Sequence, residues 1–439
     1  MVKKSVGSPR RKRKLIKAET YGGVLLLGAT VLALIWANSP LGHIYDSIFH
    51  YEIGIASSHF TLQESVLHWI NDGLMAIFFF MIGLEIKREM LIGHLNTVKK
   101  ASFPVFAALG GMIVPVSIYL IFNNDPETVR GWGIPAATDI AFSLAILQLL
   151  GKRVPIALKV FLATFAVADD LGAVIVIAAF YSVGIKWAML VGAFAIMAVL
   201  MILSRKGIYS RLLYFSASLV VWYFFLKSGI HPTVAGVLLA FTIPISKKMD
   251  VKTYVLKITG IIKDFRASDE EDKKPVLTKM QLKKIDEIKS CTHKVSSPLQ
   301  QLEYGLHDWV NYLIIPLFAL ANAGVKLRTG GSIDITLALI IMISLFAGKT
   351  IGITMFSYIG SWLGIATIPK DIDLQHLIGV ACLGGVGFTM SIFIANLAFF
   401  GYPEILNSAK MGIIMGSLIS GVTGYTLLKM MSPKPLAEV

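Results

Sequence analysis

The chain has 439 residues, of which 55% are apolar and only 15% are charged, and its mean hydropathy is +0.70. Soluble globular domains carry roughly 25% charged residues, so this composition excludes a soluble fold. The net charge of +14 does not indicate nucleic-acid binding, because the Lys and Arg residues stand between apolar segments, as they do in membrane proteins.

Twelve apolar segments follow one another along the chain, and a helix of about 20 such residues crosses the roughly 30 Å hydrocarbon core of a bilayer. The basic N-terminus and the first segment are similar to a signal peptide, but that segment is too long and no A-x-A cleavage site follows it. We expect an all-α polytopic membrane protein with about 12 transmembrane helices. The segments cover residues 21–36, 66–84, 103–122, 131–150, 155–181, 187–203, 212–226, 231–245, 306–324, 335–356, 375–397 and 408–428.

An even number of crossings puts both termini on one side of the membrane. With that side inside, the cytoplasmic segments hold 33 Lys and Arg residues and the external loops hold 6. Cytoplasmic loops carry the excess of positive charge, so both termini are predicted to be cytoplasmic. The predicted organisation is a basic tail (1–20), helices 1–8 (21–245), a long charged cytoplasmic loop (246–302), helices 9–12 (303–429) and a short tail (430–439).

Two connecting segments are long. The external segment 37–65 has no Lys or Arg, and its stretch 51–62 has strand-like residues around a turn of small residues, which predicts a hairpin. The cytoplasmic loop 246–302 mixes both charges and is interpreted as a solvated tether with some helix near 277–290; a regulatory module is the alternative. Cys291 lies in this loop and Cys382 in an apolar segment, so neither a disulfide framework nor a zinc site is supported.

Four charged residues fall well inside apolar segments: Asp139, Asp169, Asp170 and Lys349. A charge at the bilayer centre costs roughly 2.5–3.5 kcal/mol even on the lenient insertion scale, so such residues usually serve a function. A set of structural ion pairs is the alternative. Lys159 lies about one turn from the cytoplasmic end of its segment and can extend to the interface.

Asp169 and Asp170 are neighbours, so on a helix their side chains point about 100° apart. Two close carboxylates in a low-dielectric site repel each other and titrate as a coupled pair. Such a site holds protons or a cation but not both fully, and this competition is the simplest chemistry for exchange. Hard oxygen ligands suit an alkali cation, and no His/Cys cluster suits a transition metal.

Two segments contain helix-breaking residues near their middle. Gly133 and Pro135 precede Thr138–Asp139 in the fourth segment, and GGVG at 384–387 interrupts the eleventh. The two segments cross in opposite directions, which indicates an inverted repeat with a binding site at the midplane. Asp139 can compensate the positive ends of the half-helices and Lys349 the negative ends, or the reverse.

The segments GWGIPAATDIAF, FAVADDLGAV, SGIHPTVAGV, PLFALANAGV and GVGFTMSIFIANLAF, in this order, resemble the signature segments of NhaA-type sodium/proton antiporters. The resemblance extends from Tyr21 to about Lys429 and includes WINDGLMAIFFFMIGLEIKREM. It implies an electrogenic, pH-regulated antiporter in the bacterial inner membrane that exports Na⁺ or Li⁺ in exchange for H⁺ without a cofactor. It also implies a homodimer that pairs through the external hairpin in 37–65.

The resemblance assigns roles to individual residues. Asp169 and Asp170 are implied to bind the cation and the protons, Thr138 and Asp139 to lie where the interrupted helices cross, and Lys349 to lie opposite them. Asp72 is implied to lie on the external pathway. The implied pH-response residues are Glu85, Lys87, Arg88, Glu89, His231, Glu303 and His307. Tyr304 stands where the family pattern has a second histidine, and the loop 246–302 is longer than the pattern requires.

Two other functions are considered. A sodium-coupled symporter of an organic anion also uses interrupted helices, but it would have a roomy polar site and little need for proton release from adjacent aspartates. An intramembrane aspartyl protease needs two aspartates that face each other from separate helices, and Asp139 with Asp170 lacks a matching motif. No H-E-x-x-H motif is present for a metalloprotease. The chain is therefore expected not to be an enzyme.

Overall fold

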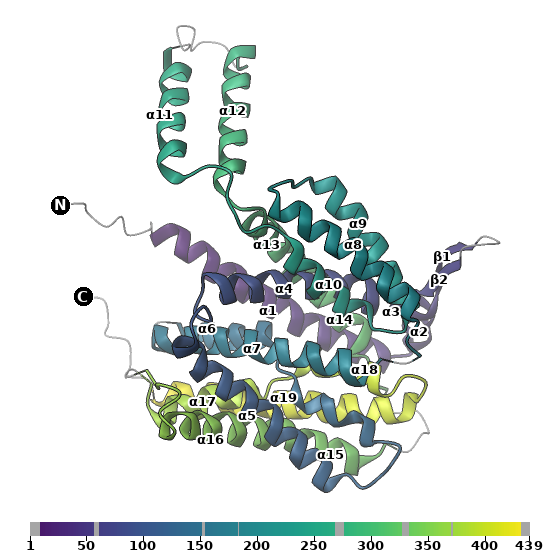
Figure 1. Ribbon diagram of the computed structural model, residues 1–439. Helices are drawn as coiled ribbons and strands as arrows, with labels where there is room; N and C mark the ends of the chain where they lie inside the picture. Colours follow the sequence, from purple (N-terminus) through teal and green to yellow (C-terminus); the bar gives the residue numbers. More distant parts are fainter. Residues whose placement is uncertain are drawn as a thin grey trace.

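The computed structural model describes residues 9–56, 61–151, 154–182, 184–267, 276–326, 333–369 and 372–431. Residues 1–8 and 432–439, which belong to the two expected tails, lie outside the described residues. The described chain is helical apart from one two-stranded sheet and the connections. Figure 1 shows long helices packed side by side, with the start of α1 and the end of α19 at one end of the bundle and the sheet at the other.

Every apolar segment expected from the sequence corresponds to a helix or to a pair of helices. The continuous ones are α1 (Pro9–Ala37), α5 (Val98–Phe122), α7 (Ile156–Phe180), α8 (Trp187–Arg205), α9 (Arg211–Ser228), α10 (Pro232–Thr242) and α19 (Pro403–Met431). The two interrupted ones are the 3₁₀ helix η2 (Val129–Ala136) with α6 (Ile140–Leu149), and α17 (Leu374–Gly384) with α18 (Phe388–Ala398).

Three further segments contain a π-helical turn between two α-helical parts. The turns are Trp69–Leu74 between α3 (Val66–His68) and α4 (Met75–Leu91), Val310–Ile314 between α13 (Pro298–Trp309) and α14 (Ile315–Asn322), and Ser344–Gly348 between α15 (Ile335–Ile343) and α16 (Lys349–Trp362). Each turn contains or directly precedes a polar residue of interest, namely Asp72, Asn311 and Lys349. π-Helical turns are often found at functional sites because they re-aim the side chains around them.

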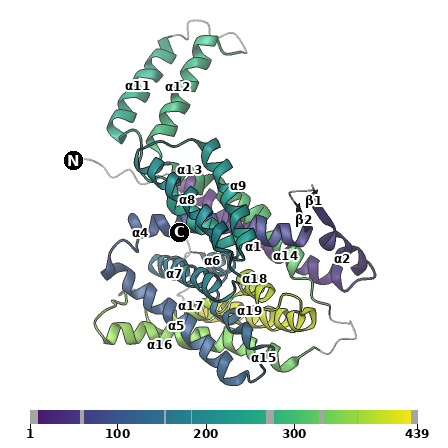
Figure 2. The same cartoon turned by 45° about the vertical axis from the view of Figure 1, so that its right-hand side comes forward.

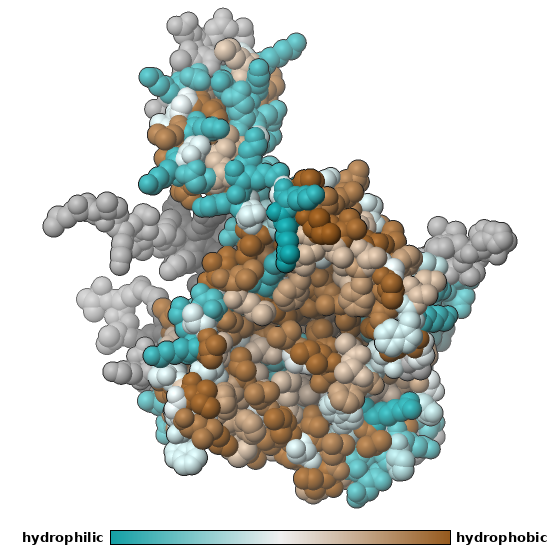
Figure 3. Space-filling view, in the orientation of Figure 1, coloured by the Kyte–Doolittle hydropathy of each residue, from teal (hydrophilic) through white to brown (hydrophobic). Residues whose placement is uncertain are grey.

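The face of the bundle that Figure 3 shows is mostly apolar. Val191 and Phe215, for example, are each 64% exposed, and such a surface requires lipid around it. Among the described residues, seven helices are long and apolar enough to cross a membrane, and up to nine if each bent helix pair counts as one crossing. The expected all-α polytopic membrane fold with two interrupted helices is confirmed, and the inverted-repeat relationship between those helices stays a prediction.

Two helix crossings are so close that only glycine fits. A Cβ on Gly110 of α5 would lie 2.1 Å from the carbonyl oxygen of Gly352 in α16, and a Cβ on Gly352 would lie 2.1 Å from that of Gly110. A Cβ on Gly236 of α10 would lie 2.3 Å from the carbonyl oxygen of Ala76 in α4. Helices in lipid associate through such close backbone packing rather than through hydrophobicity.

The expected hairpin is present, and its location on the external side stays a prediction. Strands β1 (Glu52–Ala56) and β2 (Thr61–Ser65) pair in antiparallel fashion from Glu52↔Ser65 to Ala56↔Thr61, and the turn at 57–60 lies outside the described residues. The short helix α2 (Gly42–His50), which precedes β1, was not expected.

The sequence-based expectation for the loop 246–302 was incomplete. The helix expected near 277–290 is α12 (Lys279–Val295), but a second helix, α11 (Val251–Ala267), packs against it. Figures 1 and 2 show this helical hairpin projecting away from the bundle, so the described part is not a simple tether. The charged residues of α11 concealed the apolar spacing of Tyr254, Ile258, Ile261 and Phe265, which forms its contact side.

Candidate functional site

The interruptions in the two broken helices cross each other, and their free backbone groups bond across the crossing. The Asp139 N–H donates to the Val386 carbonyl at 2.6 Å. The Thr138 hydroxyl donates to the Gly384 carbonyl at 2.9 Å, and the Ser143 hydroxyl to the Leu383 carbonyl at 2.7 Å. Unpaired backbone groups are very costly at membrane depth, so these bonds are what makes extended chain possible there.

Asp139 lies at the positive ends of two half-helices. It is the N-cap of α6, where its Oδ1 accepts from the Phe142 N–H at 3.0 Å. Its Oδ2 accepts from the backbone N–H of Thr389 at 3.0 Å and from the Thr389 hydroxyl at 2.6 Å, at the start of α18. A carboxylate at two helix N-termini is stabilised by both dipoles.

Lys349 lies at a negative end. Its Nζ donates to the carbonyl of Ala136, the last residue of the 3₁₀ helix η2, at 2.6 Å, and to the Thr138 hydroxyl at 2.9 Å. Of the two arrangements compatible with the sequence, the structure therefore has Asp139 at the N-termini and Lys349 at a carboxyl end.

Lys349 also forms an ion pair with Asp169. Its Nζ lies 2.9 Å from Oδ2 and 3.1 Å from Oδ1 of the carboxylate, and the two side chains are 0% and 1% exposed. Asp170, one residue further along α7, is also buried but lines a cavity instead. The neighbouring carboxylates therefore face different surroundings, one a lysine and the other an open space.

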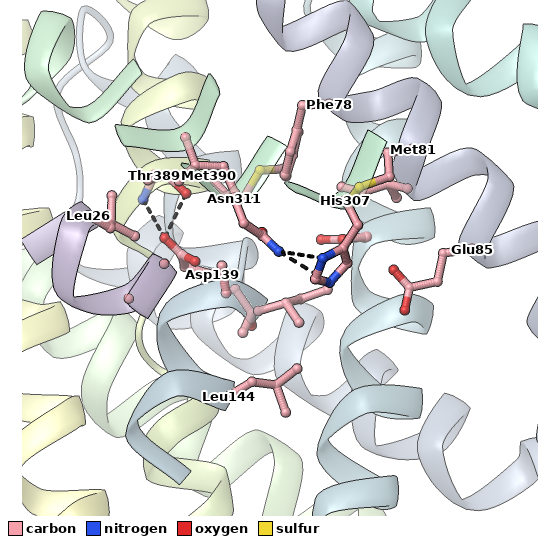
Figure 4. Close-up of a pocket in the computed structure, with 18 of the residues that line it drawn as sticks. Leu26, Phe78, Met81, Glu85, Asp139, Leu144, His307, Asn311, Thr389 and Met390 are labelled. Atoms are coloured by element: carbon pink, nitrogen blue, oxygen red, sulfur yellow. Dashed lines mark hydrogen bonds between the residues drawn. The ribbon is translucent and has the colours of Figure 1, made fainter. Parts of the chain in front are cut away.

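The cavity has a volume of about 300 Å³ and lies between α1, α4 and α13 on one side and α6, α7 and α18 on the other. Thr138, Asp139, Asp170 and Thr389 line its inner end. Its other end is lined by ionisable and polar residues, and apolar side chains including Leu26, Phe78 and Leu144 form the walls between. Figure 4 shows Asp139 and Thr389 at one side of this space and Glu85 and His307 at the other.

The cluster at the outer end of the cavity is centred on Arg88. Its guanidinium lies 2.9 Å from Glu303, 3.0 Å from Glu89 and 3.8 Å from Glu85. The ring of His307 is 3.2 Å from the amide nitrogen of Asn311 on the adjacent π-helical turn. Five of the pH-response candidates, namely Glu85, Arg88, Glu89, Glu303 and His307, thus lie at or beside this end of the cavity.

Two residues beside this cluster do not join it. The Lys87 Nζ donates to the carbonyls of Phe241 at 2.7 Å and Ile243 at 2.6 Å, where it caps the carboxyl end of α10. Tyr304, which replaces a histidine of the family pattern, is 76% exposed and points away from the cavity.

Asp72 and His231, to which the family resemblance assigns different roles, are neighbours in the structure. The Nε2 of His231 lies 3.3 Å from Oδ1 of Asp72, and the Nδ1 of the same ring lies 3.0 Å from the Thr233 hydroxyl. The indole N–H of Trp222 donates to the Asp72 carbonyl at 3.2 Å. Neither Asp72 nor His231 lines the cavity, so this group lies apart from the site that the cavity reaches.

Sequence reasoning missed one polar cluster. The amides of Asn71 and Asn322 exchange hydrogen bonds of 3.3 and 2.8 Å, and Asn396 donates to Asn322 at 2.8 Å. Asn322 ends α14 and Asn396 lies in the last turn of α18. A neutral amide does not stand out as a charge does, and its only sequence signal is a polar residue in an otherwise apolar segment.

The protein has few candidates for a resident metal. Within the described residues, no group of three or more His, Cys, Asp and Glu side chains is close enough to hold a metal ion. The carboxylate and hydroxyl oxygens of Asp139, Asp170 and Thr389 line the inner end of the cavity and are hard ligands, of the kind that suits alkali cations.

These features define a class: a polytopic helical membrane transporter built around interrupted helices. The chain belongs to the Na⁺/H⁺ antiporter 1 family, whose family model matches residues 13–428. The resemblance to NhaA-type antiporters is thereby confirmed.

Relatives of known name agree over almost the whole chain. The Na(+)/H(+) antiporter NhaA 1 of Saccharophagus degradans is 42% identical over 94% of this chain and 90% of that protein. The Na(+)/H(+) antiporter NhaA of Parabacteroides distasonis is 42% identical over 97% of each chain. That of Helicobacter pylori strain G27 is 44% identical over 95% of this chain and 94% of that protein.

Proposed function

We propose that this protein exchanges Na⁺ or Li⁺ for H⁺ across the bacterial inner membrane. The names of its relatives support this function. The observation that carries it is the buried pair of adjacent carboxylates, with Asp169 bound to Lys349 and Asp170 facing the cavity. Two adjacent charges without a cation between them are strongly disfavoured in such a site, so a cation and protons compete for it.

The exchange cycle follows from this competition. With the cavity open, Asp170 is the member of the Asp169–Asp170 pair that a cation meets first, and hydroxyl oxygens of Thr138 and Thr389 lie at the same end. Cation binding displaces the proton of Asp170. When Asp170 is protonated instead, the cation leaves, and the site is ready to carry a proton in the opposite direction.

The Lys349–Asp169 pair supports an electrogenic exchange. If the cation also binds the Asp169 carboxylate, the ion pair between Asp169 and Lys349 breaks. The Lys349 Nζ then keeps only its hydrogen bonds to the Ala136 carbonyl and the Thr138 hydroxyl. A buried ammonium that loses its carboxylate partner is strongly destabilised and releases a proton. Two protons, one from Asp170 and one from Lys349, then leave for each monovalent cation, so net charge moves.

Access to the site alternates in this mechanism. The cavity reaches the site from the end of the bundle where α4 ends and α13 begins, whereas Asn71, Asn322 and Asn396 bond one another near the opposite ends of their helices. Asn396 belongs to α18, on one side of the cavity, and Asn322 to the segment α13–α14 on the other. The asparagine cluster therefore joins the two helix groups on the side that is closed, and it has to separate when that side opens.

The cluster around Arg88 supports regulation by pH. Three carboxylates surround one guanidinium at the mouth of the cavity, with His307 nearby. Their protonation changes the charge at the entrance and the bonds that hold α4 to α13. We assign Lys87 no part in this response, because it caps α10 instead.

The orientation and the assembly are part of the proposal. The excess of Lys and Arg in the segments on the side of the termini supports cytoplasmic termini and a cytoplasmic cavity mouth. The β1–β2 hairpin then lies outside, where its edge can pair with a second copy to form a homodimer. Each protomer has a complete site, because all the site residues come from one chain.

The alternative, symport of an organic anion with sodium, is less well supported. The inner end of the cavity is lined by two carboxylates and two hydroxyls, and the nearest ammonium, that of Lys349, is bound to Asp169. An anion would be repelled there. Proteoliposomes separate the two functions: addition of Na⁺ to vesicles with an acidic lumen should drive H⁺ efflux without any organic solute. Absence of H⁺ movement without such a solute would overturn the proposal.

A further inference from the structure

The helical hairpin α11–α12 is a defined unit rather than a loose loop. Tyr254, Ile258, Ile261 and Phe265 of α11 are partly buried and face α12. The Tyr254 hydroxyl lies 3.2 Å from that of Thr292, and the Lys284 Nζ lies 3.2 Å from Oδ2 of Asp264. These contacts hold the two helices side by side along their length.

The base of the hairpin is tied to the bundle, so its direction is set. The backbone N–H groups of Lys248 and Met249 both donate to the Lys294 carbonyl at 3.0 Å. The Gln301 amide in α13 donates to the His293 carbonyl at 2.7 Å and to the Ser296 carbonyl at 3.0 Å, and accepts from Arg211 of α9 at 2.7 Å.

The direction of the hairpin runs across that of the transmembrane helices. Figure 1 shows α7 and α19 running from left to right, whereas α11 and α12 run upward, past the side of the bundle, at the end where α1 begins and α19 ends. In Figures 1 and 2, α12 is the helix of the pair nearer to the bundle. With the bundle in a bilayer, the hairpin extends along the membrane surface next to the protein, with α12 toward the lipid.

The outer side of α12 is basic with apolar flanks. Lys279 and Lys283, four residues apart, share the side of the helix opposite its contact with α11, and both are exposed. Met280 and Leu282 flank this side and are 64% and 49% exposed. Basic residues beside exposed apolar ones on an amphipathic helix are typical of a helix that lies in the membrane interface.

Lys284 does not belong to this surface. It faces Asp264 and Glu287, and the hydrogen bonds with these carboxylates raise its pKa. Asp286 is the acidic residue on the outer side, and it pairs with Lys289 at 3.4 Å. Lys279 and Lys283 are therefore the positive charges that this surface offers to an anionic partner.

We propose that the outer side of α12 lies on the cytoplasmic leaflet and binds anionic phospholipid headgroups. Lys279 and Lys283 contact the phosphates, and Met280 and Leu282 enter the headgroup region. Each Lys or Arg near an anionic surface strengthens the attraction, and the effect falls off within the Debye length. The inference rests on the orientation proposed above, not on which ions are transported.

Site-directed spin labels test the proposal in the full-length protein. In a Cys291→Ser/Cys382→Ser background, one label replaces Leu282 on α12 and a control label replaces Leu256, which is 75% exposed on the opposite, outer side of α11. In vesicles with phosphatidylglycerol, the label at 282 should become accessible to oxygen and protected from a water-soluble paramagnetic reagent. The label at 256 should stay accessible to the water-soluble reagent. Equal aqueous exposure of both labels would overturn the proposal.

A matched pair of charge variants identifies the surface that binds. Lys279→Glu/Lys283→Glu should lower the fraction of protein whose label at 282 lies in the membrane interface, by roughly fivefold or more per lysine. Lys252→Glu/Lys263→Glu, on the outer side of α11, changes the net charge equally and should leave this fraction unchanged. The signal should be lost in pure phosphatidylcholine and at high salt. Equal effects of the two variants, or protection of 282 in detergent, would overturn the proposal in favour of unspecific charge or of a protein contact.

Exchange activity separates this inference from the proposed function. Sodium-driven H⁺ movement measured in the same vesicles should persist in Lys279→Glu/Lys283→Glu, because neither residue lines the cavity and α12 projects away from the bundle. If α12 contacts the membrane but the protein shows no Na⁺/H⁺ exchange, only the proposed function is overturned. If the protein exchanges Na⁺ for H⁺ but α12 stays in water, only the proposed membrane contact is overturned.

Discussion

The Lys349 ammonium contacts both carboxylate oxygens of Asp169, at 2.9 and 3.1 Å, although 180 residues separate them. Asp170, next to Asp169 on α7, lines the cavity instead. Lys349 thus neutralises one carboxylate and leaves its neighbour for the transported ions. The first two predictions test this division of roles.

Asp170→Asn should abolish exchange. The amide cannot shed a proton and is a weaker cation ligand, so we expect a loss of ~100-fold or more, since even outer partners of metal ligands account for 10–100-fold in affinity. The measurement is sodium-driven H⁺ movement in proteoliposomes, with insertion checked by protease accessibility. Asp169→Asn should cripple exchange or change its coupling. Normal exchange by a correctly inserted Asp170→Asn protein would refute the central assignment.

Lys349→Met should destabilise the protein by about 3–5 kcal/mol, because it leaves the buried Asp169 charge without its partner. Asp169→Asn/Lys349→Met should recover much of this loss in thermal unfolding in detergent, since neither charge then remains.

For the unaltered protein, a membrane potential should drive exchange, and clamping it with valinomycin and K⁺ should change the rate. Indifference to the clamp would mean electroneutral exchange and a purely structural Lys349.

Arg88→Gln should move the pH midpoint of activation to more alkaline values. Without the guanidinium, the mouth of the cavity carries one positive charge fewer, so it attracts protons more strongly and loses them only at higher pH. Because the Arg88 side chain is 36% exposed, solvent screens the effect and we expect a shift of up to about one pH unit. Arg88→Lys should restore much of the midpoint. An unchanged midpoint in Arg88→Gln would remove this cluster from pH regulation.

Asn322→Ala should weaken the closure of the external side. It leaves the amides of Asn71 and Asn396 without their partner, at a cost of ~1–3 kcal/mol for each buried group that stays unpaired. Labelling by an impermeant reagent of a cysteine placed at Ser391 should therefore become faster from the external side. Asn311→Ala, at the opposite end of the cavity, serves as the control and should not produce this effect. Equal labelling rates in both variants would contradict the gating role.

Deletion of residues 51–62 should shift the detergent-solubilised protein from dimer to monomer and leave appreciable exchange. The deletion removes β1 and most of the pairing edge, whereas every site residue stays in place. Light scattering with size-exclusion chromatography gives the mass, and the vesicle assay gives the activity. An intact dimer would exclude the hairpin as the interface, and a folded but inactive monomer would exclude independent pathways.

Much of the fold could be predicted because its signals are local. Hydropathy located the spans, and Gly and Pro marked both interruptions. The buried charges also stood out, because each is expensive in lipid. The sequence could not show which charged residue lies at the helix N-termini of the crossing. Whether Asp139 or Lys349 lies there depends on how α6 and α18 approach each other in space.

Other features were hidden for identifiable reasons. The pairing of Asp72 with His231 joins residues that are distant in sequence and has no local signal. Asn71, Asn322 and Asn396 are uncharged, so hydropathy barely registers them. The family resemblance implied a pH-response role for Lys87, yet its side chain reaches the end of α10. Helix α11 was missed because its lysines interrupt an apolar spacing that matters only once α12 is beside it.

The glycine crossing of α5 and α16 limits which parts of the molecule can move. With Gly110 and Gly352 in backbone contact, these helices have no room to slide over a side chain, so Lys349 and the helix that carries it travel with α5 as a single rigid body. A Cβ at either position would push the helices apart and strain the bond from Lys349 to Asp169. The hinge of the transport cycle therefore has to lie elsewhere, along the seam between the α1–α4–α13 group and the crossing, where the cavity separates part of the two sides and the bond between Asn396 and Asn322 joins them.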